Sequence, residues 1–266
     1  MRKRAKFPTI FYTKISLKNK FRPIKRSKTD MEEKLTGLVL SKTDYGENDK
    51  IIKIFTLEKG TVSASLKGVK KAGAKLKFAS EPFCFAEFLI SERAGRRTVT
   101  GASLNDSFYP VREDVTKFFA AGAVLEFVRR FAKEDITSPE LFFSAIEALK
   151  NIAYGGVSPR RALCAFLISA LKIIGYALNT DECFVCGNEI KSRVFFDAFS
   201  GGFLCENCFN GEGREINHAT YVALKKIEEK EETTEEENLF ALRLLDFYVK
   251  TKAEEKINSL QELLKL

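Results

Sequence analysis

The chain has 266 residues, of which 45% are hydrophobic and 24 are phenylalanine, and its formal net charge is +8. This length and apolar content can supply the cores of two or three small domains. No apolar run reaches the length of about 20 residues that a membrane-spanning helix needs. With no secretory signal pattern, we expect a cytoplasmic protein whose cysteines are reduced.

The positive charge is concentrated at the N-terminus. Residues 1–30 hold eleven of the 44 Lys and Arg residues but only one of the 36 Asp and Glu residues. The other residues therefore hold 33 basic and 35 acidic side chains and are nearly neutral. We interpret residues 1–32 as a leader that is disordered or not native to the fold, with Met31 as the true first residue, because a strand pattern begins at about Leu35. Two alternatives are open, a disordered arm that adds phosphate contacts and a transit peptide.

Residues 33–109 show the alternating apolar pattern of β-strands. Five short runs are separated by turn signals with no helix between them: 35–40, 51–57, 62–66, 83–90 and 97–104. This pattern predicts a small closed antiparallel barrel of the oligonucleotide-binding (OB) type. The loop after the third run is basic and contains no acidic residue: Lys67, Lys70, Lys71, Lys75 and Lys77.

From residue 110 to residue 266 the apolar period becomes helical, which predicts a second, helical domain. Ser138 and Ser158 each precede a proline, and a capping hydroxyl followed by proline is typical of a helix start. Helices are expected over 112–132, from Pro139, from Pro159 to about 175, after Asn217, and over 239–249 and 257–264. The acidic stretch 228–237 is predicted to be a solvated connection between helices.

Two CxxC pairs interrupt this helical pattern, within a module over about 181–211. The pairs are Cys183 with Cys186 and Cys205 with Cys208, and the intervening residues resemble a hairpin. Two residues between cysteines let both sulfurs of a turn point at one centre, and two such turns complete a tetrahedral sulfur site that zinc favours. Because cysteine takes all four positions, we predict one structural zinc ion without a catalytic role. Cys84 and Cys164 lie in apolar runs and are expected to be buried, inert thiols.

Catalytic signals are weak in this sequence. His218 is the only histidine, which excludes a histidine-based triad or metal cluster, and no nucleotide-binding glycine motif occurs. We therefore expect a binding protein and not an enzyme. The basic loop, together with three arginines of the next hairpin, predicts sequence-independent phosphate contacts; these arginines are Arg93, Arg96 and Arg97. The alternative is a loop that serves solubility alone.

Several short blocks follow one another along the chain: Gly37-Leu38-Val39-Leu40, Tyr45-Gly46-Glu47-Asn48-Asp49, Phe55-Thr56 with Gly60, Lys67-Gly68-Val69-Lys70-Lys71, Glu81-Pro82-Phe83, Ser107-Phe108-Tyr109, Arg112-Glu113-Asp114, Gly175-Tyr176, and the two CxxC segments with Gly187 and Gly201-Gly202-Phe203-Leu204. In these blocks and their order, over about residues 34–265, the sequence resembles the RecO family of bacterial recombination mediators. Each block is weak by itself, but the ordered set is specific.

This resemblance implies an α+β multidomain fold, in which an N-terminal OB-fold barrel precedes a helical domain that carries a zinc module. It implies binding of single- and double-stranded DNA, annealing of complementary strands, and cooperation with RecR to help RecA displace single-strand binding protein (SSB). SSB proteins end in an acidic and apolar tail, which a helical groove with nearby arginines would suit. Arg129 and Arg130 are candidates for contacting that tail. The competing hypotheses are a zinc-ribbon protein of transcription or translation and a purely structural scaffold.

Overall fold

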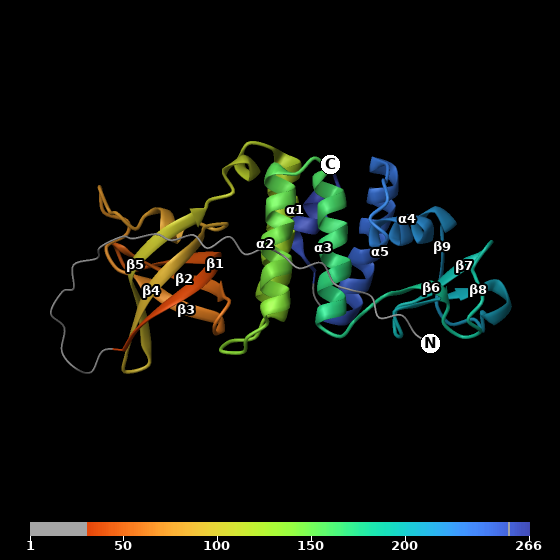
Figure 1. Ribbon diagram of the computed structural model, residues 1–266, viewed down its shortest axis with the longest axis horizontal. Coiled ribbons are helices and arrows are strands. Elements are labelled where there is room, and N and C mark those ends of the chain that lie inside the picture. The colour runs from red at the N-terminus through yellow and green to blue at the C-terminus, as the bar shows by residue number, and fades with distance from the viewer. Residues whose placement is uncertain (1–30, 255) are drawn as a thin grey trace, which may run out of the picture. The chain divides into compact units, whose positions relative to one another are not determined.

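The computed structural model describes residues 31–254 and 256–266, so the basic leader predicted over residues 1–32 lies almost entirely outside the described residues. Five strands close into a barrel in the order β1-β2-β3-β5-β4, coloured red to yellow in Figure 1. They are β1 (Met31–Tyr45), β2 (Asp49–Thr56), β3 (Gly60–Leu66), β4 (Phe85–Arg93) and β5 (Arg96–Asp106). The barrel confirms the OB-like prediction, but its first strand is longer than the predicted run.

The barrel closes because β1 is long enough to pair with two partners. Its first half pairs with β4 as far as Leu38, its second half pairs with β2 from Gly37 onward, and the pairing with β2 shifts register between Val39 and Ser41. A bulge of this kind bends and twists a strand, as closure requires. The opposite seam is short, since β3 meets β5 in a single parallel pair, Ser65 with Thr98. Apolar side chains that alternate along the strands fill the interior: Val39, Ile52, Ile54, Val62, Phe88 and Ile90.

In the described part of the chain, six α-helices follow the barrel, as the helical period predicts. They are α1 (Val115–Phe131), α2 (Pro139–Tyr154), α3 (Pro159–Ile173), α4 (His218–Glu228), α5 (Glu235–Ala253) and α6 (Asn258–Leu263). Ser158 and Asn217 cap their helices by accepting hydrogen bonds from backbone N–H groups, as predicted. Ser138 precedes α2 but forms no capping bond through its side chain, so that part of the prediction is wrong.

The acidic stretch 228–237 is only partly a connection. Its last residues form the first turn of α5, where Thr234 and Glu237 make a reciprocal capping box. Glu235, Glu236 and Glu237 lie at the positive end of the helix dipole, which favours acidic side chains. The stretch therefore helps to start a helix as well as to join two helices.

A small sheet carries the cysteines and adds β-structure to the domain that the sequence predicts as helical. Its strands are β6 (Asn179–Cys183), β7 (Val194–Asp197), β8 (Gly202–Cys205) and β9 (Arg214–Ile216), in the order β6-β8-β7-β9. The antiparallel pair β7 and β8 is the predicted hairpin. The two outer strands, β6 and β9, are not evident in the sequence.

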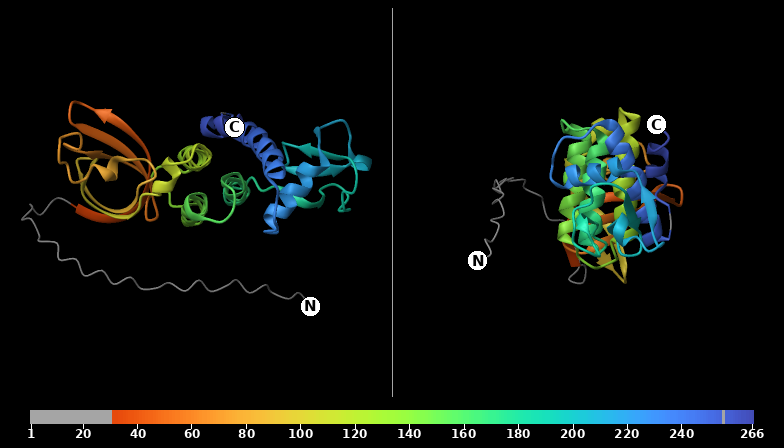
Figure 2. Two further views of the ribbon diagram at one scale, coloured as in Figure 1. Left: turned by 90° about the horizontal axis from the view of Figure 1, so that it is seen from above. Right: turned by 90° about the vertical axis from the view of Figure 1, so that its right-hand side faces the viewer.

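One apolar core runs from the barrel through the helices to this sheet. On the barrel side, the Phe142 ring of α2 lies 5.5 Å from Phe55 and 6.2 Å from Phe85, measured between ring centroids. On the other side, Phe196 of β7 packs against Tyr248 of α5 at 5.4 Å. Figure 2 shows the helices between the barrel and the smaller sheet. Among the described residues, no helix combines the length and apolar character needed to cross a bilayer.

The segment after α1 also joins the barrel directly. Thr61 of β3 forms a parallel bridge with Glu134, and the N–H of Thr61 donates to the carbonyl of Lys133 at 3.1 Å. Gly60 has a φ of +67° and lies so close to Ile136 that a Cβ would overlap the Ile136 carbonyl. Only glycine can adopt this positive φ without strain and also lie this close to the Ile136 backbone.

Candidate metal centre and nucleic-acid interface

The four predicted cysteines meet at the ends of the small sheet. Cys183 ends β6, Cys205 ends β8, Cys186 lies in the turn after β6, and Cys208 ends the 3-10 helix η3 (Glu206–Cys208). The four Sγ atoms lie within 4.8 Å of one another, and those of Cys186 and Cys205 are 3.8 Å apart. A tetrahedral ion with metal–sulfur bonds of about 2.3 Å needs sulfurs about 3.8 Å apart. The residues therefore fit a four-coordinate metal ion with no open position.

The backbone of the first turn prepares Cys183 to act as a thiolate. Burial of this side chain would raise its pKa, but N–H groups of Cys205, Cys186 and Val185 point toward its sulfur and lower the pKa to about 6. The N–H of Cys205 lies 3.4 Å from that sulfur. Gly187 closes the turn at a φ of +69°, as expected for the small residue that follows the pair. The Cys208 thiol is hydrogen bonded to Cys186, which favours its protonated form and raises its pKa to about 12.

The other two cysteines are buried in apolar surroundings, as the sequence predicts, and all six are free of disulfides. Burial raises the pKa of Cys84 to about 12 and also raises that of Cys164. Within the described residues neither of them lies in a cluster of possible metal ligands, and a buried thiol with a raised pKa is a poor nucleophile at neutral pH. These two side chains therefore belong to the core.

The predicted basic loop connects β3 to β4 and is folded onto the end of the barrel. Val69 and Ala79 are buried in the barrel core, and the 3-10 helix η1 (Phe78–Ser80) leads toward β4. The backbone N–H of Gly68 donates to Asp49 at 2.7 Å, and that of Lys70 donates to the carbonyl of Asn48 at 3.0 Å. These anchors hold the lysines at a fixed end of the barrel.

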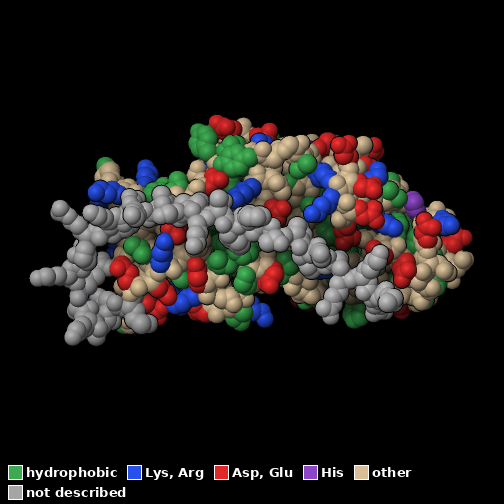
Figure 3. Space-filling model, viewed as in Figure 1, with side chains coloured by type: hydrophobic (Ala, Val, Ile, Leu, Met, Phe, Trp, Pro, Cys, Tyr) green, Lys and Arg blue, Asp and Glu red, His purple; other side chains and the backbone are tan. Residues whose placement is uncertain are grey.

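The loop lysines differ in whether an acidic side chain already neutralises them. Lys70 forms an ion pair with Asp44 of β1, its Nζ lying 2.9 Å from Oδ2. The other four are exposed and have no ion pair within residues 31–254 and 256–266: Lys67, Lys71, Lys75 and Lys77. Figure 3 shows Lys and Arg side chains interspersed with Asp and Glu on the visible face. The segment 67–77, in contrast, contains no acidic residue.

The three arginines of the β4–β5 hairpin occupy different environments. Arg93 and Arg96 are exposed near the turn. Arg97 pairs with Glu92 at 3.1 Å and, across the junction, with Asp135 at 2.8 Å, and only 17% of its side chain is exposed. Burial would lower the pKa of Arg97, but the hydrogen bonds that Arg97 donates to these two carboxylates raise it, so its charge is compensated inside the protein. Its evident contribution is to hold the hairpin to the segment after α1.

Two further lysines near the loop could not be identified from the sequence, because neither belongs to a run of basic residues. Lys42 of β1 and Lys50 of β2 both pair with Glu81, which directly follows η1. Burial would raise the pKa of Glu81, but the hydrogen bond and charge of Lys42 lower it. The two lysines lie on either side of the turn between β1 and β2, and the strand register brings them to the same end of the barrel.

The two arginines proposed for a partner tail also differ. Arg129 is exposed at the end of α1, whereas Arg130 is partly covered and donates to the carbonyl of Lys256 at 3.4 Å. Arg130 therefore links α1 to the segment that precedes α6.

Comparisons with known proteins agree with this architecture. The family model "Recombination protein O N terminal" matches residues 31–108, and the family model "Recombination protein O C terminal" matches residues 112–261. The first covers the barrel strands, and the second covers the cysteine module, the helices α1 to α5 and the start of α6.

Curated relatives match over most of their length. The chain is 29% identical over 189 residues to the "DNA repair protein RecO" of Clostridium perfringens, covering 71% of this chain and 77% of that protein. It is 33% identical over 202 residues to the protein of the same name from Anaeromyxobacter dehalogenans strain 2CP-C, covering 74% and 79%. This chain belongs to the RecO family of DNA repair proteins.

Proposed function

We propose that the protein is a DNA-binding recombination mediator without enzymatic activity. It binds single- and double-stranded DNA, anneals complementary strands and, with RecR, helps to load RecA on DNA coated with SSB. The observation that supports this best is a loop anchored on an OB-like barrel, in which four exposed lysines have no acidic partner among the described residues. The domain division that we infer is the barrel over 33–109 and the helical domain with its metal module over 110–266.

The main phosphate contacts in this proposal come from Lys67, Lys71, Lys75 and Lys77. Lys70, Arg93 and Arg96 assist, and Arg97 contributes least because two carboxylates already neutralise it. Lysine contacts phosphate as a point charge and reads no base, so binding is independent of sequence and weakens steeply with salt. Lys42 and Lys50 extend the same basic end of the barrel.

Annealing follows from the same electrostatics. Two complementary strands repel each other until their phosphates are neutralised. A loop that contacts backbones and leaves base edges free brings the strands close while they pair. Because pairing is downhill, no nucleotide hydrolysis is needed, which agrees with a sequence that lacks a phosphate-binding loop.

The metal ion in the cysteine module is, in this proposal, one structural zinc. Four thiolates in tetrahedral arrangement are the ligand set of structural zinc sites. The ion would cross-link the ends of β6 and β8 to η3. The strands of this sheet are too short to be stable by themselves. DNA binding does not pass through it, since the lysine loop belongs to the barrel.

A zinc-ribbon protein that binds nucleic acid through its cysteine module fits less well. Around the module, acidic and basic side chains are mixed and partly paired: Arg193 forms two hydrogen bonds with Glu215, each 2.8 Å long. Such a surface lacks the continuous positive charge that phosphate binding requires.

The deciding experiment is annealing of complementary oligonucleotides coated with SSB, without ATP. The full chain is compared with a variant in which Lys67, Lys71 and Lys75 are replaced by glutamine. We expect annealing by the full chain and a large loss in the variant. A full chain that binds zinc but neither binds DNA nor anneals it would rule out the proposal and leave the scaffold hypothesis.

A further inference from the structure

One exposed aromatic side chain lies beside the lysine loop and contributes no contact to the fold. Tyr45 ends β1, and 61% of this residue is exposed. Within the part of the chain that the structure describes, its ring makes no stacking or cation–π contact and its hydroxyl forms no hydrogen bond. The ring is therefore available to a ligand.

The lysine loop is bonded to the turn that begins at this tyrosine. Tyr45 is paired with Asp49 across the turn between β1 and β2. The Asp49 carboxylate accepts from the N–H of Gly68, and the carbonyl of Asn48 accepts from the N–H of Lys70. These two bonds hold the loop lysines next to the turn that carries the ring.

Tyr45 also belongs to an exposed face of the barrel. Ile52 of β2 is buried in the interior, so its neighbours Ile51 and Lys53 point outward. Thr43 is paired with Ile51, and Tyr45, two residues further along β1, lies on the same face. Ile51 keeps 37% of its area exposed, and Lys53 has no ion pair among the described residues. The loop between the first two strands is a place where OB barrels contact oligonucleotides.

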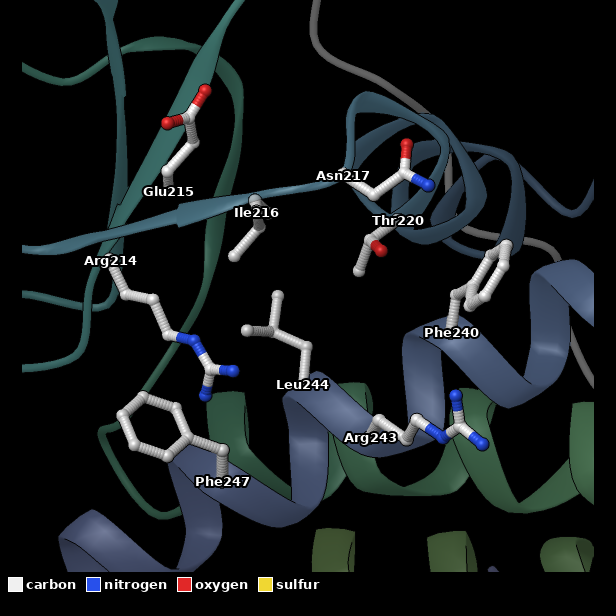
Figure 4. Close-up of a pocket in the computed structure, with 9 residues that line it drawn as sticks. All are labelled: Arg214, Glu215, Ile216, Asn217, Thr220, Phe240, Arg243, Leu244 and Phe247. Atoms are coloured by element: carbon white, nitrogen blue, oxygen red, sulfur yellow. The ribbon is translucent and has the colours of Figure 1, made fainter.

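Other exposed rings near cations differ from Tyr45 because a cation already lies over them. A groove beside α5 is lined by residues of β9, α4 and α5, and in it the Arg214 guanidinium lies 5.6 Å from the centroid of the Phe247 ring (Figure 4). Lys252 lies over the exposed Phe199 ring in the same way, at 5.7 Å. A ring face that a cation covers is not available to stack on a base.

We propose that Tyr45 stacks on an unpaired base of a single-stranded nucleic acid whose phosphates lie on the lysine loop. The inference rests on the DNA binding proposed above, and it adds a contact that depends on the state of the strand. An unpaired base offers a free π-face to an aromatic side chain, and every base can provide one. In a duplex the bases stack on one another and their faces are closed to a side chain. Tyr45 therefore makes the protein favour single strands over duplex.

This contact gives annealing a direction. Two single strands are bound through their phosphates and through a stacked base, whereas the duplex that they form keeps the phosphate contacts alone. Lysines that read only charge would hold the duplex at least as tightly, because its charge density is higher. With the stack, the product is held less tightly than the substrate, and its release frees the loop for new strands.

The test measures the anisotropy of a labelled single-stranded oligonucleotide and of the duplex of the same sequence. Tyr45→Ala in the full chain should lower the affinity for the single strand about tenfold, a typical effect of one stacked base, and leave duplex affinity and the salt slope nearly unchanged. Tyr45→Phe keeps the ring and should bind like the unmodified chain. The matched control is Tyr109→Ala, which should also bind normally: this tyrosine is equally exposed, at 61%, but begins the 3-10 helix η2 (Tyr109–Arg112) after the barrel.

A fluorescent variant reports on the contact itself. The chain contains no tryptophan, so Tyr45→Trp introduces a single indole whose fluorescence reports on this position alone. A base that stacks on the indole should quench this fluorescence when the single strand is added, and the duplex should quench it far less. Thermal unfolding should be nearly the same for all variants, since the Tyr45 side chain is exposed.

The outcomes distinguish this inference from the proposed function. A full chain that binds neither single strand nor duplex would rule out the proposed function and the stacking role with it. If the full chain binds both, but Tyr45→Ala weakens neither or weakens both equally, the stacking role is wrong and the lysine loop is unaffected. An equal loss in Tyr109→Ala would likewise contradict a specific role for Tyr45.

Discussion

Lys70 and Asp44 form an ion pair, 2.9 Å between Nζ and Oδ2, that ties the basic loop to the end of the first barrel strand. The hydrogen bond from Lys70 lowers the pKa of Asp44, so the carboxylate is charged at neutral pH and opposes phosphate binding at the loop.

Asp44→Asn should therefore tighten DNA binding. The substitution keeps the side-chain shape and releases the charge of Lys70, and a surface charge of this kind changes affinity by about two- to fivefold at low salt. Titration of a labelled oligonucleotide at several salt concentrations measures the effect. Unchanged affinity would show that DNA does not approach this end of the barrel.

Replacing Lys67, Lys71 and Lys75 with glutamine should weaken binding equally for unrelated sequences. Each lost phosphate contact lowers the slope of log K against log salt by roughly one unit or slightly less, so the slope should fall by about two to three. The control removes three exposed lysines of the helical part, Lys150, Lys191 and Lys230, and should leave the slope nearly unchanged. If both variants behave alike, binding reflects overall charge and not the loop.

Cys186→Ser should remove the metal ion and destabilise the small sheet. Metal binding and folding of such modules are coupled, so the module should lose roughly several kcal/mol of folding free energy. Metal analysis and thermal unfolding provide the measurement. Cys84→Ala is the control, because it should lower stability by leaving a cavity in the barrel and yet retain one zinc per chain. Full metal content in Cys186→Ser would contradict the four-cysteine site.

Gly60→Ala should destabilise the protein by roughly 2 kcal/mol or more, since a non-glycine residue at positive φ is strained and its methyl group would overlap Ile136. Gly46→Ala is a matched control: its φ of +63° is similar, but nothing lies within 4 Å of the added carbon. Chemical denaturation of both variants separates the cost of backbone strain at positive φ from the cost of the steric overlap with Ile136. Equal losses would mean that the segment after α1 moves away at little cost.

Glu237→Gln should make the free energy of unfolding less dependent on pH in the acidic range. The hydrogen bond from Lys226, and then the N–H of Thr234, lower the pKa of Glu237 below its ordinary value of 4.5. A lowered pKa stabilises the fold fully above pH 4.5, and this stabilisation disappears as the pH falls through the folded value. Denaturation from neutral pH to below pH 4 should give a flatter profile in the variant, whereas Glu236→Gln, an exposed neighbour in the same turn, should follow the unmodified protein.

The sequence predicts the elements whose pattern is strong. Alternation along Val62, Ala64 and Leu66 identifies a strand, and the proline after Ser158 identifies a helix start, because these signals are local. The four metal ligands are predictable for the same reason, since their spacing is local within each pair.

Elements defined by distant contacts could not be predicted in this way. The strand β6 contains Asn179, Thr180 and Asp181, a polar set that pairs only because β8 lies beside it. The ion pair of Arg97 joins residues 38 positions apart, so the sequence alone could not separate this arginine from the exposed Arg96. The groove beside α5 depends on β9, which is three residues long and has no apolar pattern.

The parallel bridge between Thr61 and Glu134 has a consequence for where the chain can be truncated. The barrel is closed between β3 and β5 by one residue pair, and the start of β3 is paired instead with the segment that follows α1. A fragment ending near residue 109 would lose that segment and expose part of a strand edge, together with the apolar surface of Phe55 and Phe85. Such a fragment should self-associate instead of remaining monomeric, so a barrel fragment prepared for binding studies should extend through the first helix and the residues that follow it.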